Sequence, residues 1–390
     1  RPIHSLSVLL TYQISSEPWF FHLVHLFYFF AAVSLVFIFI KLLTKDILFA
    51  FFTGLLFLTN PINTEIVNWV SGIPELTFTI FTLLILIFHI QYRESGSTKK
   101  LLLVYLFYFL ALFAKEPAAF LPLIVLCLDI LFFRLKIRDL FKLKELKRYV
   151  LFAVPLIIYS FMRYIVLGVG AQFGEFTLAE RIHTAITLFA YYIGKLLYPY
   201  PLALYPPFEI SSNFKSFPFF LSFITTLIFV GALFFFIKKQ KNILAFSFIW
   251  FAVFLSPVLI VIGGYWQYRP FERYLFIPGI ALAIILGYVC SRAFVYSRGT
   301  RYVVALLLLF IIGGSWLIVF PRNKDWRDSE ALITKTLQQN PNVHLIRREL
   351  GEIYFQKGEF EKAKVEFEYL IEKAPHWKDI TMAYKGLGDY

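Results

Sequence analysis

Long apolar runs separated by short polar gaps dominate this chain and restrict it to a helical membrane fold. Of the 390 residues, 59% are hydrophobic and 48 are Phe, far above the composition of soluble domains. In lipid, a spanning segment must satisfy its own backbone hydrogen bonds, so we predict an all-α, polytopic membrane helix bundle. The predicted spans are residues 20–40, 47–58, 76–90, 101–114, 118–133, 150–167, 217–237, 243–262, 274–290 and 302–320.

Several of these runs are shorter than the roughly 20 residues that a straight span needs. We expect such helices to end at cavities or to continue through polar residues. One further run, residues 185–197, is ambiguous. If it crossed, the basic clusters 238–241 and 292–301 would lie on the outer side, against the bias of the earlier gaps. We interpret it as re-entrant or interfacial, so ten crossings place residues 1–19 and everything after residue 320 outside.

The surplus of positive charge lies in alternate polar gaps. Five gaps hold 18 Lys and Arg residues against 4 acids, whereas the other gaps hold 8 of each sign. Lys and Arg accumulate on the inner side of membranes, so the net charge of +13 indicates orientation in a lipid bilayer and excludes nucleic acid as the partner. The five gaps are residues 41–46, 93–100, 134–148, 238–241 and 292–301.

The tail is soluble in character and matches the 34-residue tetratricopeptide pattern. Pro341 precedes Pro375 by one period, and a half repeat (328–339) comes before it. We predict a membrane-embedded domain over 1–320 and a truncated repeat domain over 321–390, with another unit beginning near residue 387. A stable array needs about three units, so we expect it to continue past Tyr390. The residues that match are Leu350, Gly351, Tyr354, Gly358, Ala363, Phe367 and Pro375.

Four polar clusters fall in the predicted outer gaps, where function is expected. They are Arg1-Pro2, residues 60–72, Lys115-Glu116-Pro117 and residues 268–274. Charge near membrane depth is expensive and is typical of a water-filled or substrate-filled cavity. Structural alternatives remain: a self-neutralising Lys115–Glu116 pair, interfacial anchoring by Glu272 and Arg273, and interfacial anchoring by Trp69.

Arginine and lysine on the outer side suit a lipid-borne phosphate, which favours charge-assisted donors. We expect Lys115, Arg163 and Arg273 to contribute to one anion pocket. Glu65, Asn68 and Trp69 are spaced to share one helical face. No metal is expected, because His22 and His25 lack a third ligand, and no nucleotide-binding, HExxH or GxSxG motif occurs, so we predict no cofactor. The candidate substrate-binding residues are Arg1, Asn68, Trp69, Lys115, Arg163, Glu272 and Arg273.

With these residues in view, the chain resembles integral-membrane glycosyltransferases of the family C type, in particular the transmembrane and tetratricopeptide-repeat O-mannosyltransferases and their bacterial relatives. Relatives carry histidines where this chain has Asn60 and Asn63. The order and spacing of the motifs match over nearly the whole chain. The matching stretches are Arg1-Pro2, 60–72, 114–116 with 121–122 and Asp129, 272–278 and 322–327.

The resemblance implies transfer of a hexose, such as mannose, from a polyprenyl-phosphate donor to a protein hydroxyl or glycan acceptor on the outer or lumenal face. The protein would lie in the bacterial plasma membrane, or in the endoplasmic reticulum if eukaryotic. It also implies a catalytic acid upstream of Arg1, which we expect in a missing stretch, with Glu65 and Glu116 as weaker candidates. The repeats would hold a protein acceptor or partner. Two alternatives are a non-catalytic membrane scaffold that recruits envelope partners through its repeats and a lipid-linked-sugar transporter.

Overall fold

The computed structural model describes residues 1–167, 177–208, 211, 213–260 and 270–373. Across these ranges every regular element is a helix, which confirms the predicted all-α class. The chain divides into two compact units, which we describe separately. Unit 1 comprises Arg1–Tyr200, Ile210–Tyr268 and Glu272–Trp316, and unit 2 comprises Pro201–Glu209, Arg269–Phe271 and Leu317–Tyr390.

Each predicted span contains a helix. Seven stretches among the described residues are long and apolar enough to cross a membrane, so the chain is an integral, multi-pass membrane protein. The helices are α2 (Pro18–Thr44), α3 (Ile47–Leu58), α5 (Ile73–Ser95), α6 (Thr98–Ala114), α7 (Leu121–Phe132), α9 (Ala153–Leu167), α11 (Phe217–Lys238), α12 (Asn242–Ile260), α13 (Phe276–Tyr296) and α14 (Arg298–Asp325).

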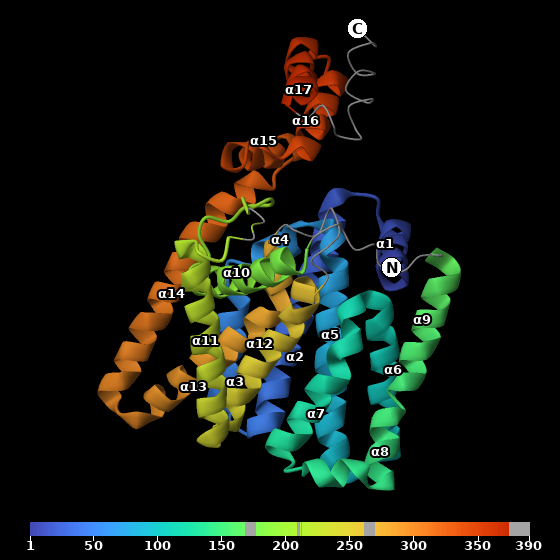
Figure 1. Ribbon diagram of the computed structural model, residues 1–390, viewed down its shortest axis with the longest axis vertical. Coiled ribbons are helices and arrows are strands. Elements are labelled where there is room, and N and C mark those ends of the chain that lie inside the picture. Colours follow the sequence, from blue (N-terminus) through green and yellow to red (C-terminus); the bar gives the residue numbers. More distant parts are fainter. Residues whose placement is uncertain (168–176, 209–210, 212, 261–269, 374–390) are drawn as a thin grey trace. The chain divides into compact units, whose positions relative to one another are not determined.

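The remaining elements of unit 1 are shorter or lie across the bundle. In Figure 1, α10 runs across the direction of the long helices, an orientation in line with the re-entrant or interfacial interpretation of residues 185–197. Helix α4 and the 3-10 segment η1 form the connection between α3 and α5. The elements are α1 (Pro2–Ile14), α4 (Asn63–Asn68), α8 (Leu143–Val150), α10 (Leu178–Leu197), η1 (Val70–Gly72), η2 (Glu116–Phe120), η3 (Ile137–Phe141) and η4 (Glu272–Leu275).

Close helix contacts fix the centre of unit 1. A Cβ atom on Gly287 of α13 would overlap the Thr53 side chain of α3, so only glycine permits this approach. Trp250 of α12 is fully buried and donates its indole N–H to the Ile277 carbonyl at 2.8 Å. Its ring stacks on Phe39 of α2 at 6.4 Å between centroids. Four helices, α2, α3, α12 and α13, pack together here. This packing fixes the positions of the helix ends that surround the site described below.

The basic gaps all meet at one end of unit 1. Polar side chains in or beside these gaps bind either another gap or the same end of α7, so the gaps that the charge count placed on the inner side lie together. We call this the inner end, and the opposite end the outer end. The joining contacts are Lys45–Glu94 (2.7 Å), Arg292–Asp46 (3.3 Å), Arg93–Asp129 (3.3 Å), Arg148–Asp129 (2.7 Å) and Asn242 Nδ2 to the Leu131 carbonyl.

Membrane orientation is testable with two exposed serines of unit 1. Ser16, between α1 and α2, belongs to the outer end, and Ser297, between α13 and α14, to the inner end. A cysteine at Ser16 should react with an impermeant thiol reagent in intact cells, whereas one at Ser297 should react only after permeabilisation. The unsubstituted chain, with Cys127 and Cys290, sets the background. Labelling of Ser297→Cys in intact cells would contradict the ten-crossing topology.

Unit 2 contains a helical hairpin. Helix α16 (His344–Gln356) packs against α17 (Phe360–Lys373), and α15 (Ser329–Gln339) precedes them. A Cβ on Gly351 would lie 2.6 Å from the Phe367 ring, and Ala363 is fully buried. These are the contacts expected of the repeat pattern; the array itself stays a prediction, and the unit expected near residue 387 lies outside the described residues.

The last segment of unit 2 begins at Leu317, within helix α14, which continues through Pro321 to Asp325. The domain boundary expected after residue 320 stays a prediction. Residues 201–209 join unit 2 because Gln339 and Asn340 donate side-chain hydrogen bonds to the carbonyls of Leu202 (2.9 Å) and Tyr205 (3.1 Å).

Candidate functional site

A cavity of about 680 Å³ opens at the outer end of unit 1. We call it the outer cavity. Lys115, Arg163 and Arg273, the three cations expected in one pocket, all line it, and Arg1 lines it as well. The short helices α6 and α7 are joined by residues 115–120, several of which line this cavity, as expected for spans that end at a cavity. The polar lining residues are Arg1, Glu75, Lys115, Glu116, Tyr159, Ser160, Arg163, Tyr164, Arg273 and Tyr274.

Arg273 forms an ion pair with Glu65, a residue far from it in the sequence. Its guanidinium lies 2.6 Å from Glu65 Oε1, and its backbone N–H donates to Oε2 at 3.1 Å. The Glu65 side chain is fully buried. The Trp69 ring lies 4.6 Å beneath the guanidinium, close enough for a cation–π contact. Glu65 is therefore committed to positioning Arg273, which weakens it as a candidate base.

The expected shared face of Glu65, Asn68 and Trp69 is wrong in part. Helix α4 ends at Asn68, and Trp69 is extended, with φ −92° and ψ 113°. Trp69 and Glu65 nevertheless both contact the guanidinium of Arg273. Neither Asn68 nor Trp69 is among the cavity-lining residues.

Lys115 pairs with Glu75, an acid that the sequence analysis did not select. The distance from Lys115 Nζ to Glu75 Oε1 is 2.9 Å, and the Lys115 ammonium also lies 5.5 Å from the Tyr274 ring centroid. Glu75 is buried in the first turn of α5. One sequence feature could have identified Glu75: it is a charged residue at the end of an apolar span, which is the feature that identified Lys115. The self-neutralising Lys115–Glu116 pair, one of the structural alternatives, is not formed: Lys115 binds Glu75 instead.

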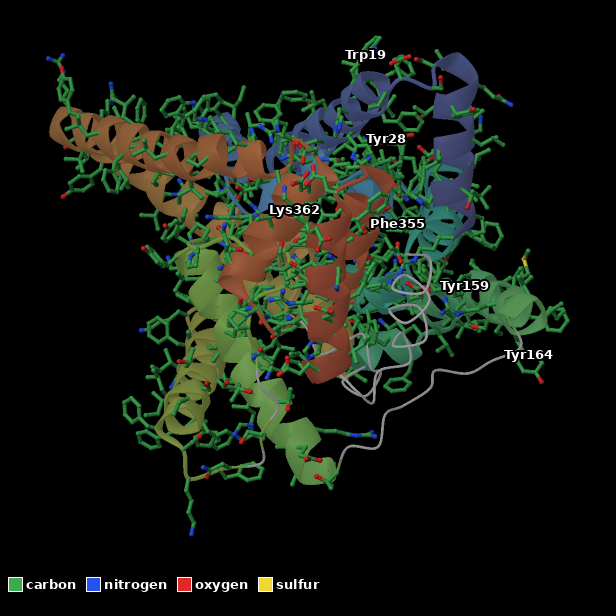
Figure 2. The ribbon with its side chains drawn as sticks, turned by 90° about the horizontal axis from the view of Figure 1, so that it is seen from above. Trp19, Tyr28, Tyr159, Tyr164, Phe355 and Lys362 are labelled. Carbon is green, nitrogen blue, oxygen red and sulfur yellow. The ribbon has the colours of Figure 1, made fainter. Side chains whose placement is uncertain are left out.

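Glu116 bridges two arginines at the cavity mouth. Its two oxygens accept from Arg1 at 3.1 Å and from Arg163 at 2.9 Å, and Arg163 also contacts the Tyr159 hydroxyl at 2.7 Å. Burial alone would raise the pKa of the Glu116 carboxyl, but Arg1 and Arg163 hold that pKa below its ordinary value. The Glu116 carboxylate therefore stays ionised at neutral pH. Tyr159 and Tyr164 mark helix α9, which also carries Arg163, in the view from above (Figure 2).

Charge is unevenly matched within the cavity. Lys115 and Arg273 each have a buried carboxylate partner, whereas Arg1 and Arg163 share one. The surplus positive charge consequently lies at the mouth, where the arginines are 42% exposed. An anion entering there meets two guanidinium groups that are only half neutralised.

Glu272 is not in the cavity, although the sequence grouped it with the binding residues. It is buried, and its carboxylate lies 3.5 Å from the ammonium of Lys195 in α10. This pair connects α10 to η4, the segment that also carries Arg273. Lys195, on the run interpreted as interfacial, was also missed by the sequence analysis.

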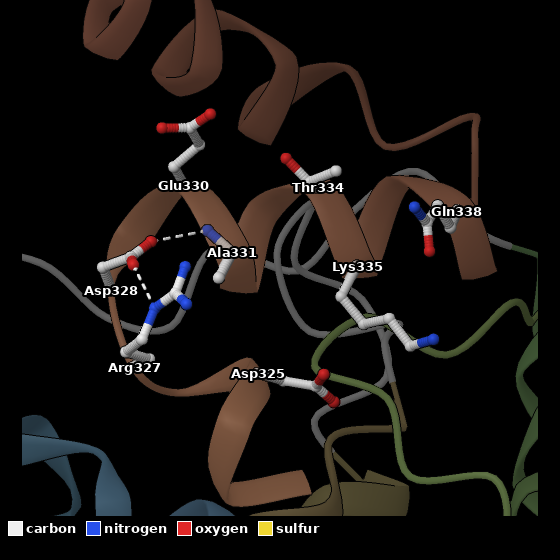
Figure 3. A pocket seen from close by; sticks show the side chains of 8 residues that line it. All are labelled: Asp325, Arg327, Asp328, Glu330, Ala331, Thr334, Lys335 and Gln338. Atoms are coloured by element: carbon white, nitrogen blue, oxygen red, sulfur yellow. Dashed lines mark hydrogen bonds and ion pairs between the residues drawn. The ribbon is translucent and has the colours of Figure 1, made fainter. Parts of the chain in front are cut away.

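A second cavity, of about 370 Å³, lies within unit 2 beside α15 (Figure 3). Within its lining, Asp328 accepts from the Ala331 N–H at 2.8 Å and from Arg327 at 2.8 Å. It lacks an apolar wall, so we do not regard it as the main site. Among the residues that the structure describes, no three His, Cys, Asp or Glu side chains are grouped to hold a metal ion.

Comparison with known proteins gives partial matches. No family model matches the chain, and no solved structure matches it significantly. The chain is similar to protein O-mannosyl-transferase Tmtc2 of Drosophila melanogaster, 28% identical over 28% of this chain and 11% of that protein. It is similar to TMTC2 of Homo sapiens, 33% identical over 24% of this chain and 12% of that one. It also matches protein O-mannosyl-transferase F38B6.6 of Caenorhabditis elegans, 22% identical over 84% of this chain.

The matched stretches span less than half the length of these relatives, from 11% of Tmtc2 to 46% of F38B6.6. The names support the resemblance to O-mannosyltransferases, and the long match to the Caenorhabditis elegans protein shows that the likeness is not confined to one stretch of the chain.

Proposed function

We propose that this chain is part of an integral-membrane glycosyltransferase with a family C type fold. It would move a hexose from a polyprenyl-phosphate donor to a protein hydroxyl on the outer or lumenal face. Two independent findings support the proposal. The outer cavity gathers phosphate-compatible cations at the end opposite the basic gaps, and the similar proteins are named protein O-mannosyl-transferases.

The amphiphilic lining of the outer cavity carries the proposal. The lining combines charged side chains with apolar ones. A polyprenyl-phosphate sugar has the same combination, with an anionic phosphate between a sugar and a hydrocarbon tail. A soluble nucleotide-sugar donor has no hydrocarbon tail to contact the apolar side chains. The apolar lining residues include Phe78, Phe120, Phe254, Val258, Ile260 and Phe276.

In the proposed reaction the acceptor hydroxyl attacks the anomeric carbon as the bond to the lipid phosphate breaks. The leaving phosphate would be neutralised at the mouth by Arg1 and Arg163, where positive charge is in surplus. Glu75 and Glu116 line the cavity, and they would orient the acceptor together with the cations that they bind. The hydroxyl proton would pass to a carboxylate that the resemblance implies upstream of Arg1 and that acts as general base.

Unit 2 would hold the protein acceptor or a partner. Stacked helix pairs of the tetratricopeptide type present a concave surface to extended peptides. The hairpin of α16 and α17 supplies one such pair.

Sugar transfer with an Arg163 variant tests this proposal. In membranes carrying the full-length protein, Arg163→Gln should lower transfer of radiolabelled sugar from a polyprenyl-phosphate donor by roughly 10-fold to 100-fold, since a charged hydrogen bond contributes about 1.5–3 kcal/mol. Arg163 is 42% exposed, so folding should survive.

Arg292→Gln is the matched control. Arg292 is also an exposed arginine paired with one carboxylate, Asp46, but it lies at the inner end. Its loss should leave transfer unchanged. Equal transfer by wild type and Arg163→Gln, or no transfer from any polyprenyl-phosphate sugar, would favour the scaffold or transporter alternatives.

A further inference from the structure

Helix α8 at the inner end is turned with its apolar face outward. Arg148 is buried, at 4% exposure, whereas Leu143 and Val150 are 65% and 57% exposed. A surface helix in water buries its apolar stripe instead. Since this helix presents the apolar stripe to its surroundings, the surroundings must be apolar, as the edge of a bilayer is.

A buried ion network fixes this orientation. Asp129 of α7 is fully buried and accepts from Arg148 at 2.7 Å, from Tyr149 at 2.5 Å and from His89 at 2.8 Å. Glu145 points the same way, 3.5 Å from Arg93 and paired with Arg148. The polar face of α8 is therefore locked against α5 and α7, and the helix cannot roll to hide its leucines.

Exposed cations flank the outward apolar face. Only two acids occur in residues 136–150: Asp139 pairs with Lys142 at 2.8 Å, and Glu145 faces the bundle. What this segment presents to its surroundings is thus cationic as well as apolar. The exposed cations are Lys136, Arg138, Lys142, Lys144 and Lys147, and the exposed apolar residues are Ile137, Phe141, Leu143, Leu146 and Val150.

We propose that residues 136–150, the inner basic segment, form a binding site for anionic phospholipid headgroups. The apolar side chains insert between acyl chains while the lysines reach the phosphates, the arrangement of an interfacial helix on an anionic leaflet. Helix α1 provides an internal contrast. It also exposes leucines and buries Ser7 and Thr11, but it contains no Lys or Arg, so it fits lipid of any charge. This inference is independent of the proposed transfer activity.

Lipid titration of the full-length protein in neutral detergent micelles tests the proposal. Fluorescent phosphatidylglycerol should bind more tightly than fluorescent phosphatidylcholine. The triple variant Lys142→Gln, Lys144→Gln, Lys147→Gln should lose at least roughly tenfold in affinity for phosphatidylglycerol, since each lysine near an anionic surface contributes about fivefold. The matched triple variant Lys238→Gln, Lys239→Gln, Lys241→Gln removes equally exposed inner lysines and should retain most of it.

Phe141→Ser tests the apolar half of the site. Phe141 is 78% exposed, so its loss should weaken lipid binding without unfolding the protein. Four outcomes would overturn the proposal: equal binding of the two lipids, equal loss in the two triple variants, displacement of the lipid by soluble glycerol phosphate at equal concentration, or unchanged lipid binding by Phe141→Ser.

Discussion

Replacing Glu65 by leucine is expected to lower the free energy of unfolding by about 3–5 kcal/mol, because the change leaves a buried cation without its partner. The Arg273 side chain is only 13% exposed, and Glu65 is its carboxylate partner at 2.6 Å. Denaturant titration in micelles measures the loss. Glu94→Gln, which removes an exposed acid paired with Lys45, should change stability little.

The double variant Glu65→Leu, Arg273→Met separates stability from function. Removing both charges together should recover most of the lost stability, since the pair's cost of desolvation disappears with its attraction. Sugar transfer should not recover, because Arg273 lines the outer cavity. Recovery of both would show that Arg273 serves only the fold. A single Glu65→Leu variant as stable as wild type would contradict the buried pair itself.

Asp129→Asn should be at least as damaging, again by about 3–5 kcal/mol. The change keeps the shape of the side chain but removes the charge that neutralises Arg148, which is 4% exposed, and Arg93. Thermal unfolding of the purified protein measures the effect. Asp139→Asn, an acid at the same end that pairs with an exposed lysine, is the control and should unfold close to wild type. Equal melting of the two variants would argue that the Asp129 network does not hold α7 and α8 together.

The helices were predictable because each signal is local. A helix lies in each of the ten spans that length and hydropathy predicted, and the hairpin followed from small residues such as Gly351 and Ala363 at fixed spacing. Charge in alternate gaps predicted which helix ends lie together, since membrane insertion sorts Lys and Arg to one side.

Side-chain partners were not predictable, because they depend on contacts between distant parts of the chain. Arg273 is 208 residues from Glu65, and Lys115 is 40 residues from Glu75. A charged residue beside an apolar span indicates that an oppositely charged partner is needed. The periodicity of the sequence does not identify that partner. Sequence reasoning therefore grouped Lys115, Arg163 and Arg273, which do line one cavity, but it did not identify Glu75 as the partner of Lys115. It also grouped Glu272 with them, although Glu272 does not line that cavity.

The outward orientation of the apolar face of α8 could not be predicted from the sequence for a related reason. Its sequence has the alternation of an amphipathic helix, which fits either orientation. Only the buried position of Asp129 decides the matter, since that carboxylate draws Arg148 inward.

Equilibrium binding of a radiolabelled polyprenyl phosphate to the full-length protein tests the central claim most directly, namely that the outer cavity receives a lipid-borne phosphate. We expect the phosphate to bind more tightly than the uncharged polyprenol of the same length, and Arg163→Gln to reduce its affinity by roughly tenfold or more while Arg292→Gln does not. Equal affinity for phosphate and alcohol, or equal binding by the two variants, would contradict the claim.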